Sequence, residues 1–596
     1  MNRKARRAEH KRGKASARPA SEPAGPLWAQ ARQLYRQGQL AAAEQSCRQI
    51  LAGEPGHGGS HHLLGLIAQA AGQHNSAVRS FAKAVEADPD AADWHYDLAL
   101  SYQALGRRDR AVSHFTRALT LQPEGAWALA RLTQRPAIAG ALHRLAASWP
   151  KPLSIAELFG PAGLAALAGD AFLHCALKNI WLCHAPLELL LTRVRAELLQ
   201  DAVARAPNFA GGDEQTLGLL AAIAQQCFIN EYVYAVSEEE ARQADELRGR
   251  LAGKREVGEA ISPLLLAAVA AYTPLHTLSN ASLLLRAEGL DPLAELLRQQ
   301  VTEPLEELAD RATIPALTAI DARSTAVRRQ YEENPYPRWS AIPPHRPQPP
   351  AAGEPADILI AGCGTGKHAI DAALLFPRAR VLAIDISLAS LAYARRKTRE
   401  AGISNIEYAQ ADILRLGSID RRFDRIESIG VLHHLRDPKA GFRALLSLLK
   451  PDGVLEVALY SEIARRAVVA ARALIAERGY PPTAQGIRAC RQEILRTGGS
   501  LAQSLTTTRD FYGASGCRDL LFNAMEHRYT LPQIKALLAE LDLTLLAFEA
   551  EPETLARFQR EFPGASVNDL DRWHAFETAH PDTFLGMYRF LVRPAR

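Results

Sequence analysis

The strongest candidate for a functional site is a glycine-rich turn, Gly362-Cys363-Gly364-Thr365-Gly366. The turn follows an apolar run at 357–360 that suits a buried parallel strand, and it leads into a helix predicted over 367–376. Glycines let backbone N–H groups at a strand-to-helix turn approach a ligand closely, because no Cβ atom intervenes. The pattern therefore predicts a loop that holds a bound small molecule.

The glycine spacing narrows the choice of ligand. A dinucleotide loop of the GxGxxG type needs Gly or Ala where this chain has Lys367, and the third glycine comes one position early, at Gly366. No Gly-Lys-Ser/Thr sequence follows, so a phosphate-binding P-loop also fits poorly. A nicotinamide-dependent dehydrogenase stays a distant alternative.

Carboxylates stand at the ends of the next two predicted strands. The strand at 381–384 ends in Asp385, where an acid would accept two hydrogen bonds from a ribose diol. The strand at 406–408 leads to Asp412, which is placed to accept a hydrogen bond from an adenine amino group. These positions favour an adenosine-containing ligand.

The elements around these residues alternate between strands and helices. A fourth strand begins at Phe423-Asp424 and leads to Val431-Leu432-His433-His434-Leu435, and we expect Asp424 to organise the sheet. A helix over 438–449 then meets the turn at 450–453, which opens a fifth strand at 454–459. The alternation predicts a mostly parallel α/β sheet.

This order of motifs resembles the small-molecule-type branch of class I S-adenosylmethionine (SAM)-dependent methyltransferases. The resemblance covers roughly 325–460 and two late strands, at 543–548 and 587–592, which would be the antiparallel pair that closes the sheet of this family. It implies a Rossmann-like domain over 357–596 with a mostly parallel seven-stranded sheet, an insertion at about 461–540, and SAM as the cofactor.

The resemblance also implies the contacts of the cofactor. The glycines would pass under the methionine part of SAM, Asp385 would hold the ribose, and Asp412 with Ile413 the adenine. Tyr336 or Trp339 could face the sulfonium and Arg338 the SAM carboxylate, although simple hydrophobic docking of this segment explains it equally well. The expected cofactor contacts are Gly362, Cys363, Gly364, Gly366, Asp385, Ile386, Asp412, Ile413, Tyr336 and Arg338.

One position departs from the family pattern. An acid often stands two residues before the first glycine and helps to fix the SAM amino group, but this chain has Ile360 there. The amino group would need another partner.

Methyl transfer needs an aligned acceptor and, for a hydroxyl or protonated amine, a group that removes a proton. The candidates are His433, at the tip of the fourth strand, and Glu526 with His527 in the insertion. Arg518 could hold an anionic acceptor there. A helical lid with surface salt bridges explains the same charged residues, so both interpretations stay open.

A repeat of thirty-four residues precedes these regions. When the sequence is shifted by thirty-four residues, leucine, small, aromatic and proline positions coincide: Leu64 on Leu98, Gly65 on Ala99, Gly72 on Gly106, Ala77 on Ala111, Phe81 on Phe115, Ala84 on Ala118 and Pro89 on Pro123. The pattern resembles tetratricopeptide repeats, three of them over 24–130 with a possible cap near Trp127. Such repeats usually bind a protein or peptide partner; docking on the rest of this chain and self-association are the alternatives.

The remaining segments carry less information. Residues 131–320 are rich in Leu and Ala at helical spacing and predict a helical domain of unknown role, in which Asn230-Glu231-Tyr232 fits buried polar residues that cap helices. Residues 321–356 form an aromatic and Pro-rich linker. The first 23 residues predict a disordered basic tail, and the first eighteen of them contain eight Lys or Arg against the single acid Glu9.

Composition excludes several classes of function. The net charge of +5 comes from that tail, so nucleic-acid binding is not expected except through the tail itself. The longest apolar stretch is too short and too interrupted for a transmembrane segment, and no signal-peptide core is present. Seven scattered cysteines, never spaced as CxxC, predict neither a disulfide framework nor a zinc site, and we expect no metal and a cytoplasmic location.

Together these patterns predict a multidomain protein: an all-α tetratricopeptide solenoid, a helical middle domain and an α/β class I methyltransferase domain, similar to bacterial repeat–methyltransferase fusions. It would transfer a methyl group from SAM to an unidentified acceptor, with the repeats recruiting a partner or substrate. The alternative is a tetratricopeptide scaffold with a non-catalytic SAM-sensing domain.

Overall fold

The computed structural model describes residues 25–205, 214–342 and 355–595. The basic tail at 1–23 and the prolines at 343–350 lie outside the described residues. The chain forms two compact units, residues 1–122 and 123–596, and each is described by itself. No helix in the described ranges is long and apolar enough to cross a membrane.

Three helix pairs make up the first unit: α2 (Pro26–Arg36) with α3 (Leu40–Gly53), α4 (Gly58–Ala70) with α5 (His74–Ala87), and α6 (Ala92–Ala104) with α7 (Arg108–Leu121). Gly38, Gly72 and Gly106 sit in the turns of the pairs with φ of 74°, 71° and 71°. That left-handed conformation suits glycine, which explains why the glycine recurs at this period.

Small residues let the helices of a pair approach closely. A Cβ atom on Gly65 would lie 2.4 Å from the ring of Phe81. Phe81 and Phe115 are fully buried, as are Ala77 and Ala111. The positions that define the repeat in the sequence are therefore its packing positions.

The second unit begins with helices only: α8 (Ala126–Leu132), α9 (Pro136–Ser148), α10 (Ile155–Phe159), α11 (Ala165–Ala168), α12 (Ala171–Asn179), α13 (Ala185–Ala204), α14 (Glu214–Ile229), α15 (Glu238–Glu256), α16 (Pro263–Ala270), α17 (Ala294–Leu297) and α18 (Glu303–Arg311). The apolar face predicted on α13, from Leu187 to Leu198, is buried. The middle region (residues 123–320) and the sheet region that follows belong to one compact unit.

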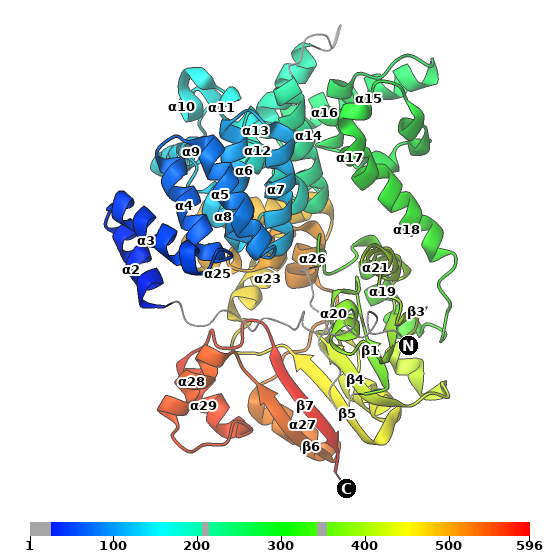
Figure 1. The fold of residues 1–596 in the computed structure, drawn as a ribbon. Coiled ribbons are helices and arrows are strands. Elements are labelled where there is room, and N and C mark those ends of the chain that lie inside the picture. Colours follow the sequence, from blue (N-terminus) through cyan, green and yellow to red (C-terminus); the bar gives the residue numbers. More distant parts are fainter. Residues whose placement is uncertain (1–24, 206–213, 343–354, 596) are drawn as a thin grey trace, which may run out of the picture. The chain divides into compact units, whose positions relative to one another are not determined.

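A single seven-stranded sheet follows, formed by β1 (Asp357–Ala361), β2 (Arg380–Asp385), β3 (Ile406–Gln410), β4 (Phe423–Ile429), β5 (Leu449–Leu459), β6 (Leu543–Glu549) and β7 (Tyr588–Pro594) (Figure 1). The strand order is β3-β2-β1-β4-β5-β7-β6. Strand β7 runs antiparallel to both neighbours, so the sheet is mixed and not purely parallel. Asp424 accepts hydrogen bonds from the backbone N–H groups of Ala356 and Asp357 and so ties β4 to the start of β1.

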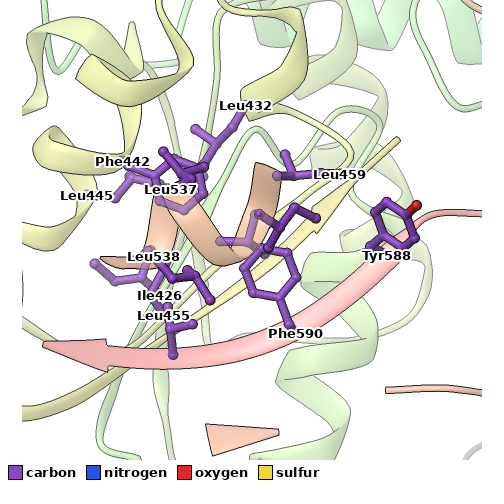
Figure 2. Close-up of a cluster of buried hydrophobic side chains, with 14 of the residues drawn as sticks. Ile426, Leu432, Phe442, Leu445, Leu455, Leu459, Leu537, Leu538, Tyr588 and Phe590 are labelled. Atoms are coloured by element: carbon purple, nitrogen blue, oxygen red, sulfur yellow. The ribbon is translucent and has the colours of Figure 1, made fainter. Parts of the chain in front are cut away.

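Helices cover both faces of the sheet: α19 (Thr325–Glu333), α20 (Lys367–Leu375) and α21 (Leu388–Glu400), and, from later in the chain, α22 (Pro438–Leu446), α27 (Leu531–Glu540), α28 (Pro552–Glu561) and α29 (Leu570–Ala579). One core joins Ile426, Leu455 and Phe590 of the strands to Phe442 of α22 and Leu538 of α27 (Figure 2). A second core, around Ile358 and Ile360, packs against α20 and α21.

The insertion consists of α23 (Arg466–Arg478), α24 (Ala484–Thr497), α25 (Gly499–Leu505) and α26 (Ala514–Phe522). We expected it to reach about residue 540, but α27 already belongs to the core of the sheet, since Leu531 and Ile534 are fully buried there. The insertion therefore ends before α27.

The middle region packs against the insertion and contacts it through buried polar side chains. Arg491 on α24 and Glu188 on α13 form an ion pair at 2.8 Å, and the two side chains are 0 % and 2 % exposed. The Trp181 indole donates to the carbonyl of Tyr512 at 3.0 Å. These contacts join segments some three hundred residues apart in the sequence.

Candidate functional site

A cavity of about 400 Å³ lies at the carboxyl ends of β1, β2 and β4, where ligands bind in open α/β sheets. Its wall includes residues from the loops after these strands and from the segment before β1: Tyr331, Tyr336, Gly362, Cys363, Gly364, His368, Asp385, Ile386, Asp412, Ile413, His434, Tyr460 and Met587. Eight of the ten expected cofactor contacts are among them; Gly366 and Arg338 are not.

The glycine loop has the backbone that its composition predicted. Gly362, Gly364 and Gly366 have φ of 83°, 51° and 85°. A Cβ atom on Gly364 would lie 2.4 Å from the carbonyl oxygen of Tyr336, and one on Gly366 would lie 2.5 Å from the Cβ of Ala394. Gly366 thus serves the packing at the start of α20, whereas Gly362 and Gly364 form the cavity wall.

Asp385 links the end of β2 to the glycine loop. Its Oδ2 accepts from the Gly364 N–H at 2.8 Å, and its Oδ1 accepts from the Ser387 N–H at 2.9 Å. Burial raises the pKa of Asp385 to about 6, against the opposing effect of these two hydrogen bonds. Each carboxylate oxygen has a second lone pair, so the side chain can still accept hydrogen bonds from a diol.

Asp412 lies in a closed part of the cavity and is 1 % exposed. Its Oδ1 accepts from the Leu414 N–H and its Oδ2 from the Asp321 N–H, both at 3.0 Å. Its own backbone N–H donates to Thr318 Oγ1 at 2.8 Å. The chain ahead of α19 is therefore fixed against the end of β3, far upstream of the predicted domain start at residue 357.

The aromatic segment before β1 packs over the glycine loop. The Trp339 indole is 4 % exposed and donates to Thr365 Oγ1 at 3.1 Å, so Trp339 docks on the loop from outside the cavity. Tyr336 does line the cavity. Arg338 does not: its Nε lies 3.0 Å from Glu231 Oε1, so its half-buried guanidinium is paired with a carboxylate away from the cavity.

His433 is fully buried outside the cavity. Its ring centroid lies 3.9 Å from that of Tyr460, and neither ring nitrogen has a hydrogen-bond partner among the described residues. Burial, with the neighbouring His434 and Arg465, lowers the pKa of His433 well below its usual value. The adjacent His434 lines the cavity instead, and its Nδ1 contacts the carbonyl of Met525 at 2.7 Å.

The two candidates from the insertion also lie away from the cavity. Glu526 is held by Arg465, with Oε2 and Nη2 at 2.5 Å, and its side chain is 1 % exposed. His527 donates its backbone N–H to the carbonyl of His433 at 2.8 Å, behind the cavity wall. Arg518 donates to the carbonyl of Phe522 on its own helix. None of these three side chains lines the cavity.

A carboxylate stands beside the position where the family acid is missing. Ile360 on β1 is in register with Glu427 on β4. Glu427 Oε2 lies 2.5 Å from Nε2 of His368, a residue of the cavity wall. Burial raises the pKa of Glu427, but His368 and Arg425 outweigh it and lower the value to about 2. Sequence reasoning missed this pair because nothing in the sequence pairs β1 with β4.

Comparisons with known proteins match two regions of the chain. Residues 358–453 match the family described as "Methyltransferase domain", and residues 68–132 match "Tetratricopeptide repeat". An uncharacterized protein of Synechococcus sp. is 42 % identical over 117 residues, which are 20 % of this chain and 28 % of that protein. Malonyl-[acyl-carrier protein] O-methyltransferase of Acetivibrio thermocellus is 33 % identical over 149 residues, 24 % of this chain and 49 % of the relative.

Among solved structures, PKMT2 from Rickettsia typhi in complex with AdoHcy is 18 % identical, covers 40 % of this chain and 48 % of that one, and has a TM-score of 0.32. The chain spans half or less of the length of the two curated relatives above.

The chain thus contains a class I methyltransferase domain and a tetratricopeptide repeat region. The methyl donor of this domain is SAM. The cavity suits SAM because close-packed glycine backbone, two carboxylates and apolar residues such as Ile386 and Ile413 meet in its wall. Glycines 362 and 364 with Tyr336 would hold the methionine part, Asp385 the ribose, and Asp412 with Ile413 the adenine.

Proposed function

We propose that this protein is a SAM-dependent methyltransferase that methylates an acceptor recruited by its repeats. The observation that carries the proposal is the cavity at the carboxyl ends of β1, β2 and β4, whose wall contains two of the three loop glycines and both strand-end acids. Bound SAM would supply an electrophilic methyl group. The protein has to align the acceptor, exclude water and accept a proton.

Residues of the cavity wall are placed to exclude water and to align the acceptor. The segment with Tyr331 and Tyr336 covers the glycine loop, and Tyr460 follows β5 at the same cavity. These residues would exclude water from the methyl group and shape the acceptor space. His434 lies in the cavity wall, whereas His433 does not. His434 is therefore the histidine that we propose as a contact of the bound ligands.

The second candidate function is a scaffold with a SAM-sensing domain. Ile360 favours it, because the usual acid is missing. Glu427, one strand away and linked to the wall through His368, argues against it, because a carboxylate is still present at this level of the sheet.

Two measurements with the whole protein separate these functions. Calorimetry should give micromolar or tighter binding of SAM and S-adenosylhomocysteine, and no binding of NADH. Extracts incubated with the protein and tritiated SAM should then gain non-exchangeable label. Binding without any label transfer would favour the sensor, and absence of SAM binding would exclude both.

A further inference from the structure

Three tyrosines form the cavity wall at the end next to the insertion: Tyr331, Tyr336 and Tyr460. The Tyr336 hydroxyl donates to Oδ2 of Asp510 at 3.1 Å, and the Tyr331 hydroxyl donates to Oδ1 of Asp519 at 2.7 Å. Both acids come from the insertion, Asp510 from the short turn before α26 and Asp519 from α26 itself. A pair of carboxylates therefore lies directly behind the aromatic wall.

The two arginines near these carboxylates form their ion pairs with other acids. Arg465 pairs with Glu526 at 2.5 Å and lies over the ring of Tyr460, 3.7 Å from its centroid. Arg509 lies 3.9 Å from Glu124. Asp519 receives hydrogen bonds from neutral donors, the Tyr331 hydroxyl and the Asn523 amide at 2.9 Å. Buried charges are normally paired with opposite charges. Two acids next to a ligand cavity without an ion-pair partner in the described chain would gain from a cationic ligand.

We infer that the acceptor is a primary or secondary amine, which binds as an ammonium against Tyr331 and Tyr336 and passes its proton through the Tyr336 hydroxyl to Asp510. The inference rests on the proposed methyltransferase function and names its substrate class. Tyrosine faces attract a desolvated ammonium, and the two carboxylates add to that attraction. The same carboxylates would repel an acceptor with a carboxylate or phosphate group.

The proton transfer and the methyl transfer balance. The ammonium gives one proton to the Tyr336 oxygen while the Tyr336 hydroxyl gives its own proton to Asp510. The freed nitrogen lone pair forms the new N–C bond, and the electron pair of the broken C–S bond stays on sulfur. The products are a methylated ammonium, neutral S-adenosylhomocysteine and protonated Asp510, which later returns its proton to water.

The surroundings tune Asp510 for this role. Burial and the nearby Asp519 raise its pKa to about 7, while Tyr336, Arg465 and Arg509 act to lower it. A base is most effective when its pKa is near the working pH. Asp510 acts through Tyr336, so it is a positioning residue and proton store, whereas Tyr336 would touch the amine.

The test uses the whole protein saturated with S-adenosylhomocysteine and three probes of equal chain length: n-butylammonium, butan-1-ol and butyrate. We expect calorimetry at pH 8 to show n-butylammonium binding at least about tenfold more tightly than the other two, which is about 1.4 kcal/mol. Its affinity should fall as the pH drops from 8 to 6, because Asp510 becomes protonated. Asp510→Asn should weaken binding at least about fivefold and flatten this pH dependence, and Asp510→Glu should restore part of both.

Tyr512→Phe is the matched control for Tyr336→Phe. Tyr512 is buried beside Asp510, donates its hydroxyl to the carbonyl of Thr506 at 2.9 Å and does not line the cavity. Tyr512→Phe should leave amine affinity unchanged, while Tyr336→Phe should lower it, because the hydroxyl that contacts the amine is lost. Equal or tighter binding of butanol or butyrate, absence of amine binding, or an unchanged profile in Asp510→Asn would overturn the inference. Lack of SAM binding would instead defeat the proposed function.

Discussion

The two ends of the cavity that we propose for the cofactor and for the acceptor are built in different ways. The cofactor end uses Gly362, Gly364, Asp385 and Asp412, which lie within about fifty residues and follow consecutive strands. The acceptor end uses Tyr336, Tyr460 and Asp510, and the insertion that carries Asp510 is fastened to the middle region. Local motifs therefore specify the first end, while long-range packing specifies the second.

The largest expected effect concerns the contact that supports the acceptor end. Arg491→Met leaves Glu188 buried without a partner, and we expect a loss of about 3–5 kcal/mol in local stability. Native-state hydrogen exchange of α24 and α26 measures it. SAM affinity should change far less, because the glycine loop and Asp385 do not contact this pair.

A control for that prediction is Arg478→Met. Arg478 pairs with Glu493 at 3.0 Å, but its side chain is 51 % exposed, so the loss of stability should be much smaller than for Arg491→Met. Equal effects of the two substitutions, or an equal loss of SAM binding, would show that the two ends are not separable in this way.

The next effect concerns the cofactor end. Asp385→Ala should weaken SAM binding by about 1–3 kcal/mol, because hydrogen bonds from the ribose to a carboxylate are lost. Calorimetry with the variant measures it, with the exposed residue Asp420→Ala as the control. An unchanged SAM affinity in Asp385→Ala would remove the assignment of this residue to the ribose.

A smaller effect should appear in the pH dependence of SAM binding. The pKa of Asp385 is raised to about 6, and hydrogen bonds from a diol favour its ionised form. Binding should then release a proton, so affinity should rise from pH 5 to pH 7 and level off above, by up to about tenfold per unit of pKa change. Asp385→Asn should give a flat profile; a profile unchanged by this substitution would assign the proton to another group.

The smallest effect on SAM should follow removal of the first compact unit. A chain that begins at Pro123 should bind SAM within about twofold of the full chain, because repeats contact mainly their neighbours. Label transfer to a macromolecular acceptor should fall when the repeats are missing. If the shortened chain stays folded and loses SAM binding, the repeats are needed for the cofactor end.

How far the site could be predicted depends on whether its parts are neighbours in the sequence. Asp385 and Asp412 were predictable because each ends a strand whose apolar run is visible, and parallel strands end at one edge of the sheet. His433 and His434 show the limit: adjacent residues after β4 point differently, and only packing against Tyr460 decides that His434 lines the cavity. The expected contact of Arg338 with the SAM carboxylate shows the same limit, because the ion-pair partner of Arg338 in the structure is Glu231, over a hundred residues away in the sequence.

The sequence by itself determined the repeat period, the glycine turn and the acids at the strand ends, because each depends on local backbone geometry or on one strand. Tertiary structure decided the pairing of Ile360 with Glu427 and the position of the carboxylates behind the tyrosine wall. Those features depend on which distant segments pack together. The buried ion pair of Glu188 and Arg491 is an example, because its two residues come together only when the middle region packs against the insertion.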